Sequence, residues 1–134
     1  MLNKVFLIGN VGKEPEIKTF KSGDKVANFS LATTESWKDK KTNEWVKKTE
    51  WHNIVVFGEG LVNLIERSVK KGSKIYIEGK LATRKWAGSD GKNIYATEVI
   101  LKGFGGTIKL LDPKTTNEPK ATPQSAIDDD IPFN

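Results

Sequence analysis

Short apolar runs separated by turn residues occupy most of the chain before Asp112. These runs are rich in β-branched and aromatic residues or alternate between apolar and polar positions, and turns such as GNVG and KSGD end two of them. This pattern is typical of short β-strands, one of them long enough to curve. The predicted strands are KVFLIG (4–9), EIKTF (16–20), KVANFSLATTES (25–36), TEWHNIVVFG (49–58), SKIYIEGKLATRKW (73–86), IYATEVILKG (94–103) and a last short one in GTIKLL (106–111).

The period of the pattern changes once, in the segment GLVNLIERSVKKG. Apolar side chains recur there at helical spacing, at Leu61, Leu64, Ile65 and Val69. Gly72 stands where a glycine cap commonly ends a helix. We therefore expect one helix in the middle of the chain.

Apart from the short runs at 16–20 and 106–111, the order is three strands, one helix and two strands. This order predicts an all-β OB-fold, a five-stranded Greek-key barrel with a helix between its third and fourth strands. An SH3-like barrel or a plain α+β domain also fits the strand count, but the position of the helix favours the OB-fold. We expect residues 1–111 to form this domain. The following segment has three of the five prolines and no periodicity, which predicts a disordered linker over 112–126 before an acidic tip at 127–134.

Charge is distributed unevenly between these parts. The whole chain carries +5, but residues 1–111 hold 20 Lys/Arg against 12 Asp/Glu, which is +8, and residues 112–134 hold two against five, which is −3. A basic body favours a polyanionic ligand, and an acidic tail suggests a separate partner. No apolar run approaches the roughly 18 residues of a membrane span, so we expect no membrane association.

Aromatic residues among lysines are the strongest indication of a ligand. The stretch SWKDKKTNEWVKKTEW (36–51) holds three of the four tryptophans and five lysines. We expect Trp37 and Trp45 to lie in a lysine-rich loop that no core reaches, and Trp86 to end another strand. In the strand 49–57, alternation places Trp51, Asn53, Val55 and Phe57 on one face and His52, Ile54 and Val56 on the other.

Such rings can stack on nucleic-acid bases whatever the sequence, while neighbouring lysines and arginines neutralise phosphates. Duplex bases are already stacked, so this surface favours single strands. Catalysis is poorly supported, because the chain has no cysteine and a single histidine, His52, in mid-strand. We expect no enzyme activity, no metal site and no cofactor.

The segments NKVFLIGNVGKEPE, SLATTESWKDKKTNEWVKKTEWH, KGSKIYIEGKLATRKW and DDDIPF closely resemble the bacterial single-stranded DNA-binding protein family. The resemblance implies an OB-fold, a homotetramer wrapped by single-stranded DNA, no catalysis, and cytoplasmic, nucleoid-associated roles in replication, recombination and repair. It implies a subunit-interface position for His52. The positions implied to bind DNA are Trp37, Trp51, Phe57, Trp86, Lys71, Arg84 and Lys85.

The resemblance also implies that the acidic tip recruits replication and repair proteins. The tip residues are Asp128, Asp129, Asp130, Ile131, Pro132 and Phe133. The chain departs from the family at Trp45, which is often a smaller or aliphatic residue, at Asn53 and Glu59, which are often basic, and at Asn134, which follows the usual terminal Phe.

Two other functions fit parts of the pattern. An RNA-binding OB module would use the same stacking surface, but it has no need of the DDDIPF tip. A small enzyme would use His52 as a base. A His52→Ala variant that keeps full activity would rule out this function.

Overall fold

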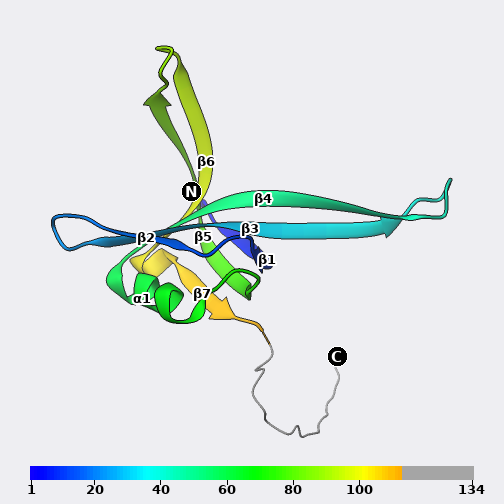
Figure 1. Ribbon diagram of the computed structural model, residues 1–134, viewed down its shortest axis with the longest axis horizontal. Helices are drawn as coiled ribbons and strands as arrows, with labels where there is room; N and C mark the ends of the chain where they lie inside the picture. Colours follow the sequence, from blue (N-terminus) through cyan, green and yellow to red (C-terminus); the bar gives the residue numbers. More distant parts are fainter. Residues whose placement is uncertain (113–134) are drawn as a thin grey trace, which may run out of the picture.

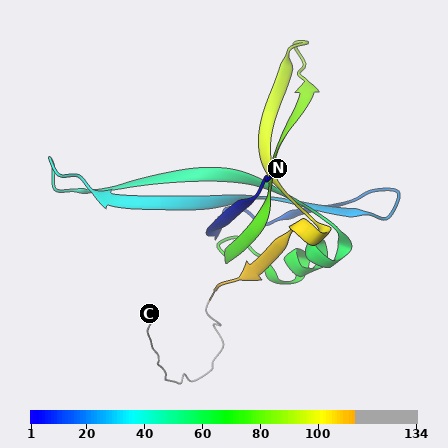
Figure 2. The same ribbon diagram turned by 180° about the vertical axis from the view of Figure 1, so that it is seen from behind.

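The computed structural model describes residues 1–112, which form a barrel with two hairpins extending from it (Figures 1 and 2). The elements in chain order are β1 (Val5–Val11), β2 (Glu16–Thr19), β3 (Lys25–Lys38), β4 (Trp45–Phe57), α1 (Glu59–Ser68), β5 (Lys74–Ala87), β6 (Asn93–Lys102), the 3₁₀ turn η1 (Gly103–Gly105) and β7 (Thr107–Leu110). Five strands close the barrel in the order β1–β3–β4–β6–β5, and β5 pairs again with β1.

This arrangement confirms the predicted OB-fold. The barrel strands follow the sequence as β1, β3 and β4, then α1, then β5 and β6, so the helix lies between the third and fourth of them. The pairing of β4 with β6 is parallel, and the other pairings in the ring are antiparallel. Two short strands lie outside the ring, where β2 pairs with β3 and β7 pairs with β5.

The core explains why alternating sequences form this barrel. Alternate positions of each strand point inward, such as Ile54 and Val56 on β4 or Ile75 and Ile77 on β5, and all four are at most 1% exposed. α1 adds Val62 and Ile65 from its buried stripe. Full burial of one such side chain stabilises the fold by about 1.5–3 kcal/mol. Closing the ring therefore gives the small domain its one continuous core.

The helix ends earlier than the sequence predicts. Gly72 does not cap it, because α1 stops at Ser68 and Val69 continues in extended conformation with only 2% of its surface exposed. The chain thus leaves the helix at Val69, whose N–H still donates to the Ile65 carbonyl while its side chain lies in the core. Gly72 instead adopts a positive φ of 90° in the next turn, where its N–H donates to the Val11 carbonyl at 2.7 Å.

The prediction that Trp37 and Trp45 lie in a loop is wrong. β3 and β4 pair residue by residue up to Lys38 and Trp45, so both indoles belong to a long hairpin that projects from the barrel (Figure 1). A compact turn permits this, because the Asp39 carboxylate accepts from the Lys41 N–H at 2.7 Å and Asn43 adopts a φ of 64°. We call residues 33–50 the hairpin arm.

The end of the described chain remains attached to the barrel. The Asp112 carboxylate accepts hydrogen bonds from the Lys74 N–H at 3.0 and 3.1 Å, although Asp112 begins the expected linker. The expected acidic tip lies outside the described residues. Within residues 1–112, no helix is long and apolar enough to cross a membrane.

Candidate nucleic-acid interface

A groove runs across the outer face of the barrel. It consists of two adjoining hollows of about 520 and 450 Å³, which share Glu16, Asn28, Arg84 and Glu98 as lining residues. We call the two together the outer groove. Strands β2, β3, β4, β6 and β5 all contribute to it, so only the closed sheet can assemble it.

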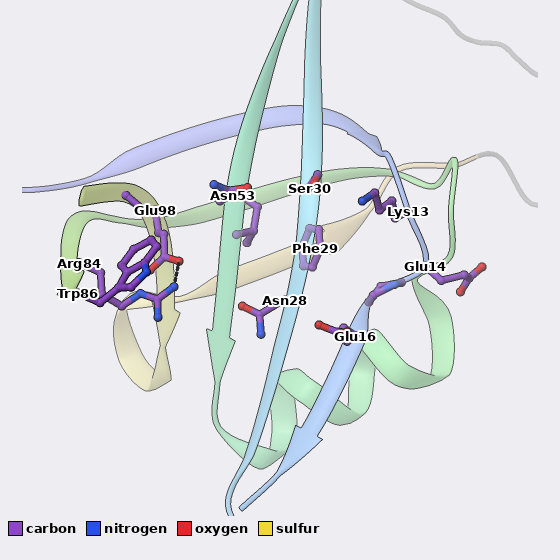
Figure 3. Close-up of a pocket in the computed structure, with 13 residues that line it drawn as sticks. Lys13, Glu14, Glu16, Asn28, Phe29, Ser30, Asn53, Arg84, Trp86 and Glu98 are labelled. Carbon is purple, nitrogen blue, oxygen red and sulfur yellow. Dashed lines mark hydrogen bonds and ion pairs between the residues drawn. The ribbon is translucent and has the colours of Figure 1, made fainter. Parts of the chain in front are cut away.

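Polar side chains line the middle of the outer groove, and aromatic rings stand at its ends. Asn28 and Asn53 project from the central strands, between the bank formed by Glu14 and Glu16 and the bank formed by Arg84, Trp86 and Glu98 (Figure 3). At the other end, Phe57 and Phe20 border the second hollow. Amides can donate and accept hydrogen bonds, so this lining suits flat polar groups flanked by rings.

The predicted faces of β4 are confirmed. Ile54 and Val56 are buried in the core, whereas Trp51 and Asn53 are exposed and Phe57 is half-buried on the outer side. Val55 lies on the outer face as predicted, but neighbouring strands cover it to 8% exposure. The alternation in the sequence thus separates core residues from groove residues along this strand.

Trp51 lies directly over a glycine of the loop between β1 and β2. A Cβ added to Gly12 would come within 2.4 Å of the Trp51 Cζ3 atom, a distance that van der Waals contact forbids. The indole nevertheless remains 61% exposed. The edge of the six-membered ring is therefore held close to the Gly12 backbone, while most of the indole is open to solvent.

Arg84 occupies one face of the Trp86 ring. Its guanidinium carbon lies 5.1 Å from the ring centroid, within the range of a cation–π interaction. The same guanidinium bonds the Glu98 carboxylate at 3.0 Å, and the Glu98 side chain is only 9% exposed (Figure 3). Glu98 therefore fixes the Arg84 guanidinium, which in turn orients the Trp86 indole. The charge of Arg84 is already paired with Glu98 before any ligand binds.

Two further cations lie next to rings, and the sequence analysis missed both pairs. The Lys102 Nζ atom lies 5.1 Å above the Phe57 ring, because the parallel register of β4 and β6 sets these residues side by side. The Lys85 Nζ atom lies 6.0 Å from the ring of Tyr95, its partner across β5 and β6. Lys102 and Phe57 lie far apart in the sequence, so only the strand order could reveal that they meet.

The predicted DNA-binding residues do not all meet at the groove. Trp86 and Arg84 line it, Phe57 borders it, and Trp51 stands at its rim beside Asn53. Lys85 points to the other side of β5, since it alternates with Arg84 and Trp86. The remaining two positions, Trp37 and Lys71, lie on the hairpin arm and on the turn after α1.

Lys71 is nevertheless connected to the groove. Its backbone N–H donates to the Glu14 carboxylate at 3.2 Å, and Glu14 lines the first hollow. His52, the expected subunit-interface residue, is half-buried on the opposite side of β4 from Trp51. Its Nε2 atom lies 2.8 Å from the Thr33 hydroxyl, a hydrogen bond that spans β3 and β4.

A separate exposed surface lies on β1 and β5. Phe6 and Ile8 point outward with 60% and 53% of their surface exposed, opposite Glu78 and Tyr76. The Tyr76 hydroxyl donates to Glu78 at 2.6 Å, which raises the pKa of Tyr76 and, together with Lys4 at 3.4 Å, lowers the pKa of Glu78. This surface is apolar with one ordered polar cluster, unlike the outer groove.

Residues 2–110 match the model of the single-strand binding protein family. The match covers the whole barrel, and the chain belongs to this family. Two curated relatives, both named single-stranded DNA-binding protein, agree with that assignment. The one from Rickettsia felis is 50% identical over 98% of this chain and 97% of its own length. The one from Rhizobium meliloti is 52% identical over 83% of this chain and 64% of its own length.

A solved structure agrees with the fold as well. A Plasmodium falciparum SSB in complex with ssDNA superimposes with a TM-score of 0.75 and is 49% identical, over 84% of this chain and 96% of that one. The likeness extends over nearly all of the described residues. It therefore supports both the OB-fold and the membership of the family.

Proposed function

We propose that this protein binds single-stranded DNA without sequence preference and without catalysis, in replication, recombination and repair. Membership of the single-strand binding protein family supports the proposal. The observation that carries it is the outer groove, where backbone packs against Trp51 and a cation lies over each of Phe57 and Trp86. Rings held in this way lose little freedom when a base stacks on them.

The ring geometry favours single strands over duplexes. A base must expose its face to stack on Trp51 or Trp86, and duplex bases hide their faces. Each stacked base contributes about 1–3 kcal/mol regardless of its identity. The proposed binding is therefore tolerant of sequence but selective for unpaired bases.

The charges around the groove orient the strand. Three carboxylates line the first hollow, from Glu14, Glu16 and Glu98, against the cations of Lys13 and Arg84. A phosphate inside the groove would meet these carboxylates, so we infer that bases enter and phosphates stay outside. Asn28 and Asn53 would then bond base edges, and Lys102 would reach a phosphate beside Phe57.

Three of the proposed DNA-binding residues lie away from the groove, namely Trp37, Lys71 and Lys85. We propose that they contact DNA that has left it, since a strand longer than the groove must continue over the surrounding surface. Their contribution depends on strand length, which distinguishes them from Trp51 and Phe57.

The test is a tryptophan-fluorescence titration with poly-dT at two salt concentrations, beside duplex DNA and poly-U. We expect strong quenching by poly-dT, almost none by duplex, and weaker binding at higher salt because phosphate contacts release counterions. Equal quenching by duplex would refute the stacking mechanism. Tighter binding of poly-U than of poly-dT would favour an RNA-binding role instead.

We propose that four copies assemble, so that one strand can pass over several barrels. The exposed apolar side chains of Phe6 and Ile8 support an interface on β1. His52, bonded to Thr33 on the inner side of the β3–β4 pair, is the residue we assign to subunit contact. Light scattering should report four copies, and His52→Glu should shift the protein toward smaller species. If the wild-type protein is a monomer, the proposed passage of one strand over several barrels is wrong, but the proposed binding in the outer groove is unaffected.

We propose, from the resemblance of the DDDIPF segment alone, that the acidic tip of residues 127–134 recruits replication and repair proteins. Its apolar residues would fill a pocket while the aspartates meet basic residues around it. Phe133→Ala should abolish pull-down of such partners, whereas deletion of Asn134 should preserve it. Retention of every partner by Phe133→Ala would contradict this role.

A further inference from the structure

The two sides of the hairpin arm differ, and an unbroken register defines them. β3 and β4 pair without a bulge from Val26↔Phe57 to Lys38↔Trp45. Because side chains alternate along a strand, Trp45 projects from the same side of β4 as Trp51 and Phe57. We call this side of the arm the front face. Trp37, paired with Val46, projects from the back.

Hydrogen bonding across the arm agrees with this assignment. The hydroxyls of Thr34 and Thr49 lie 3.0 Å apart, and these residues are a cross-strand pair on the front face. The front face therefore continues from the rim of the outer groove, at Trp51, to the tip of the arm. The right-handed twist of a two-stranded ribbon turns this face gradually but does not interrupt it.

The two faces carry different charges. The front face of the arm has Lys38 and Lys47 and no carboxylate, with threonine and serine between the indoles. The back face has Glu35 and Glu50 against Lys48, and the Lys48 ammonium already pairs with Glu50 at 3.4 Å. Among the ion pairs of residues 1–112, neither Lys38 nor Lys47 takes part. The front face of the arm is therefore net positive and the back face net negative, so phosphates favour the front face.

The indoles also differ in exposure and spacing. Trp45 is 70% exposed, Trp51 61% and Trp37 46%. Trp45, Trp51 and Phe57 are spaced six residues apart along β4, so about 20 Å separates neighbouring rings at 3.3 Å per residue. That is about six stacked nucleotides at 3.4 Å each, and fewer when the strand is extended.

We propose that the front face of the hairpin arm is an additional binding site for single-stranded DNA, with Trp45 stacking a base and Lys38 and Lys47 binding phosphates. This inference rests on the proposed function and extends it. The strand leaves the outer groove at Trp51 and follows the front face to the tip. The site lengthens the DNA that one subunit contacts, and its indole is Trp45. Trp37, on the back of the arm, belongs to a different part of the proposed DNA path.

The test compares thymidylate oligomers of two lengths, about six and about fifteen nucleotides, on the full chain. The short one spans a single ring spacing and can bind in the groove between Phe57 and Trp51, whereas only the long one can span all three rings. Trp45→Ala should weaken binding of the long oligomer about fivefold or more and leave the short one within about twofold. Trp45→Phe should keep most of the affinity, and Trp51→Ala should weaken both lengths.

Two adjacent lysines provide a matched control. Lys47 faces front and Lys48 faces back, so replacement of either removes one charge at nearly the same place. Lys47→Ala should reduce the slope of log affinity against log salt by about 0.7 per subunit engaged, the value for one phosphate on a single strand. Lys48→Ala should leave the slope unchanged, because its charge is already paired.

Each possible result decides the question. The inference is overturned if Trp45→Ala binds the long oligomer within twofold of wild type, or if it loses affinity equally for both lengths. It is also overturned if the two lysine variants have equal salt slopes. The proposed function would survive all of these results. It fails separately if the wild-type chain does not bind even the long oligomer.

Discussion

The barrel groove and the hairpin arm use the same residue types in different surroundings. In the groove, Trp51 lies against Gly12 and Trp86 lies beneath Arg84, which the buried Glu98 carboxylate holds. In the arm, no core lies behind the strands, and Trp37 and Trp45 project from opposite sides of a two-stranded ribbon. The groove positions its rings before any ligand arrives.

The difference teaches how a fold divides a binding surface. A ring backed by a packed barrel has its orientation fixed when the protein folds, so a ligand does not have to order it. A ring on a two-stranded arm keeps rotamer freedom and must lose it on binding. We therefore expect the groove to provide most of the affinity per base and the arm to add length.

The largest expected difference concerns backbone stability. Amides in the barrel pairs Phe29↔Ile54 and Leu31↔His52 should exchange with solvent roughly a thousandfold or more slowly than those at Trp37↔Val46, because the barrel opens only on global unfolding and the arm opens locally. Native-state hydrogen exchange without DNA measures this. Equal protection in both regions would show that the arm is as rigid as the barrel.

The next effect concerns the rings themselves. Trp51→Ala and Phe57→Ala should each cost about 1–3 kcal/mol of binding free energy, or about 5–150-fold in affinity for poly-dT. Trp37→Ala should cost less, because Trp37 lies on the back of the arm beside Glu35. Circular dichroism serves as the folding control. A greater loss of affinity for Trp37→Ala than for Trp51→Ala would show that the arm, not the groove, provides more of the binding free energy.

A smaller effect should follow from disturbing the support of one ring. Gly12→Ala would bring a Cβ within 2.4 Å of the Trp51 indole and displace it, so we expect a several-fold loss of affinity and a change in the intrinsic fluorescence. Gly60→Ala is the control, because a Cβ there meets nothing within 4 Å and alanine suits a helix. If both variants bind like wild type, the contact with Gly12 does not position Trp51.

The smallest effect on DNA binding should come from the acidic tail. Deletion of residues 127–134 removes three of the five carboxylates of a −3 segment that can compete for the +8 body. We expect affinity for poly-dT to be unchanged or tighter by about twofold, most clearly at low salt where the screening length is about 30 Å. Weaker binding after the deletion would mean that the tail assists DNA binding.

Much of the groove could be predicted from local sequence, because alternation is a property of one strand. The separation of Trp51 and Phe57 from Ile54 and Val56 onto opposite sides of β4 required only the period of the strand. The helix was recognisable for the same reason. Its end was not, since Gly72 bonds instead to the Val11 carbonyl of β1, a contact between residues distant in sequence.

The sequence by itself determined the barrel, the place of the helix, and a basic surface with exposed aromatic rings. Only the tertiary structure decided which rings and charges meet. The register of β3 with β4 converted a supposed loop into strands and put Trp45, not Trp37, on the side of Trp51. The pairing of β4 with β6 brought Lys102 over Phe57. Both depend on contacts between residues distant in sequence, which no local pattern of polar and apolar positions encodes.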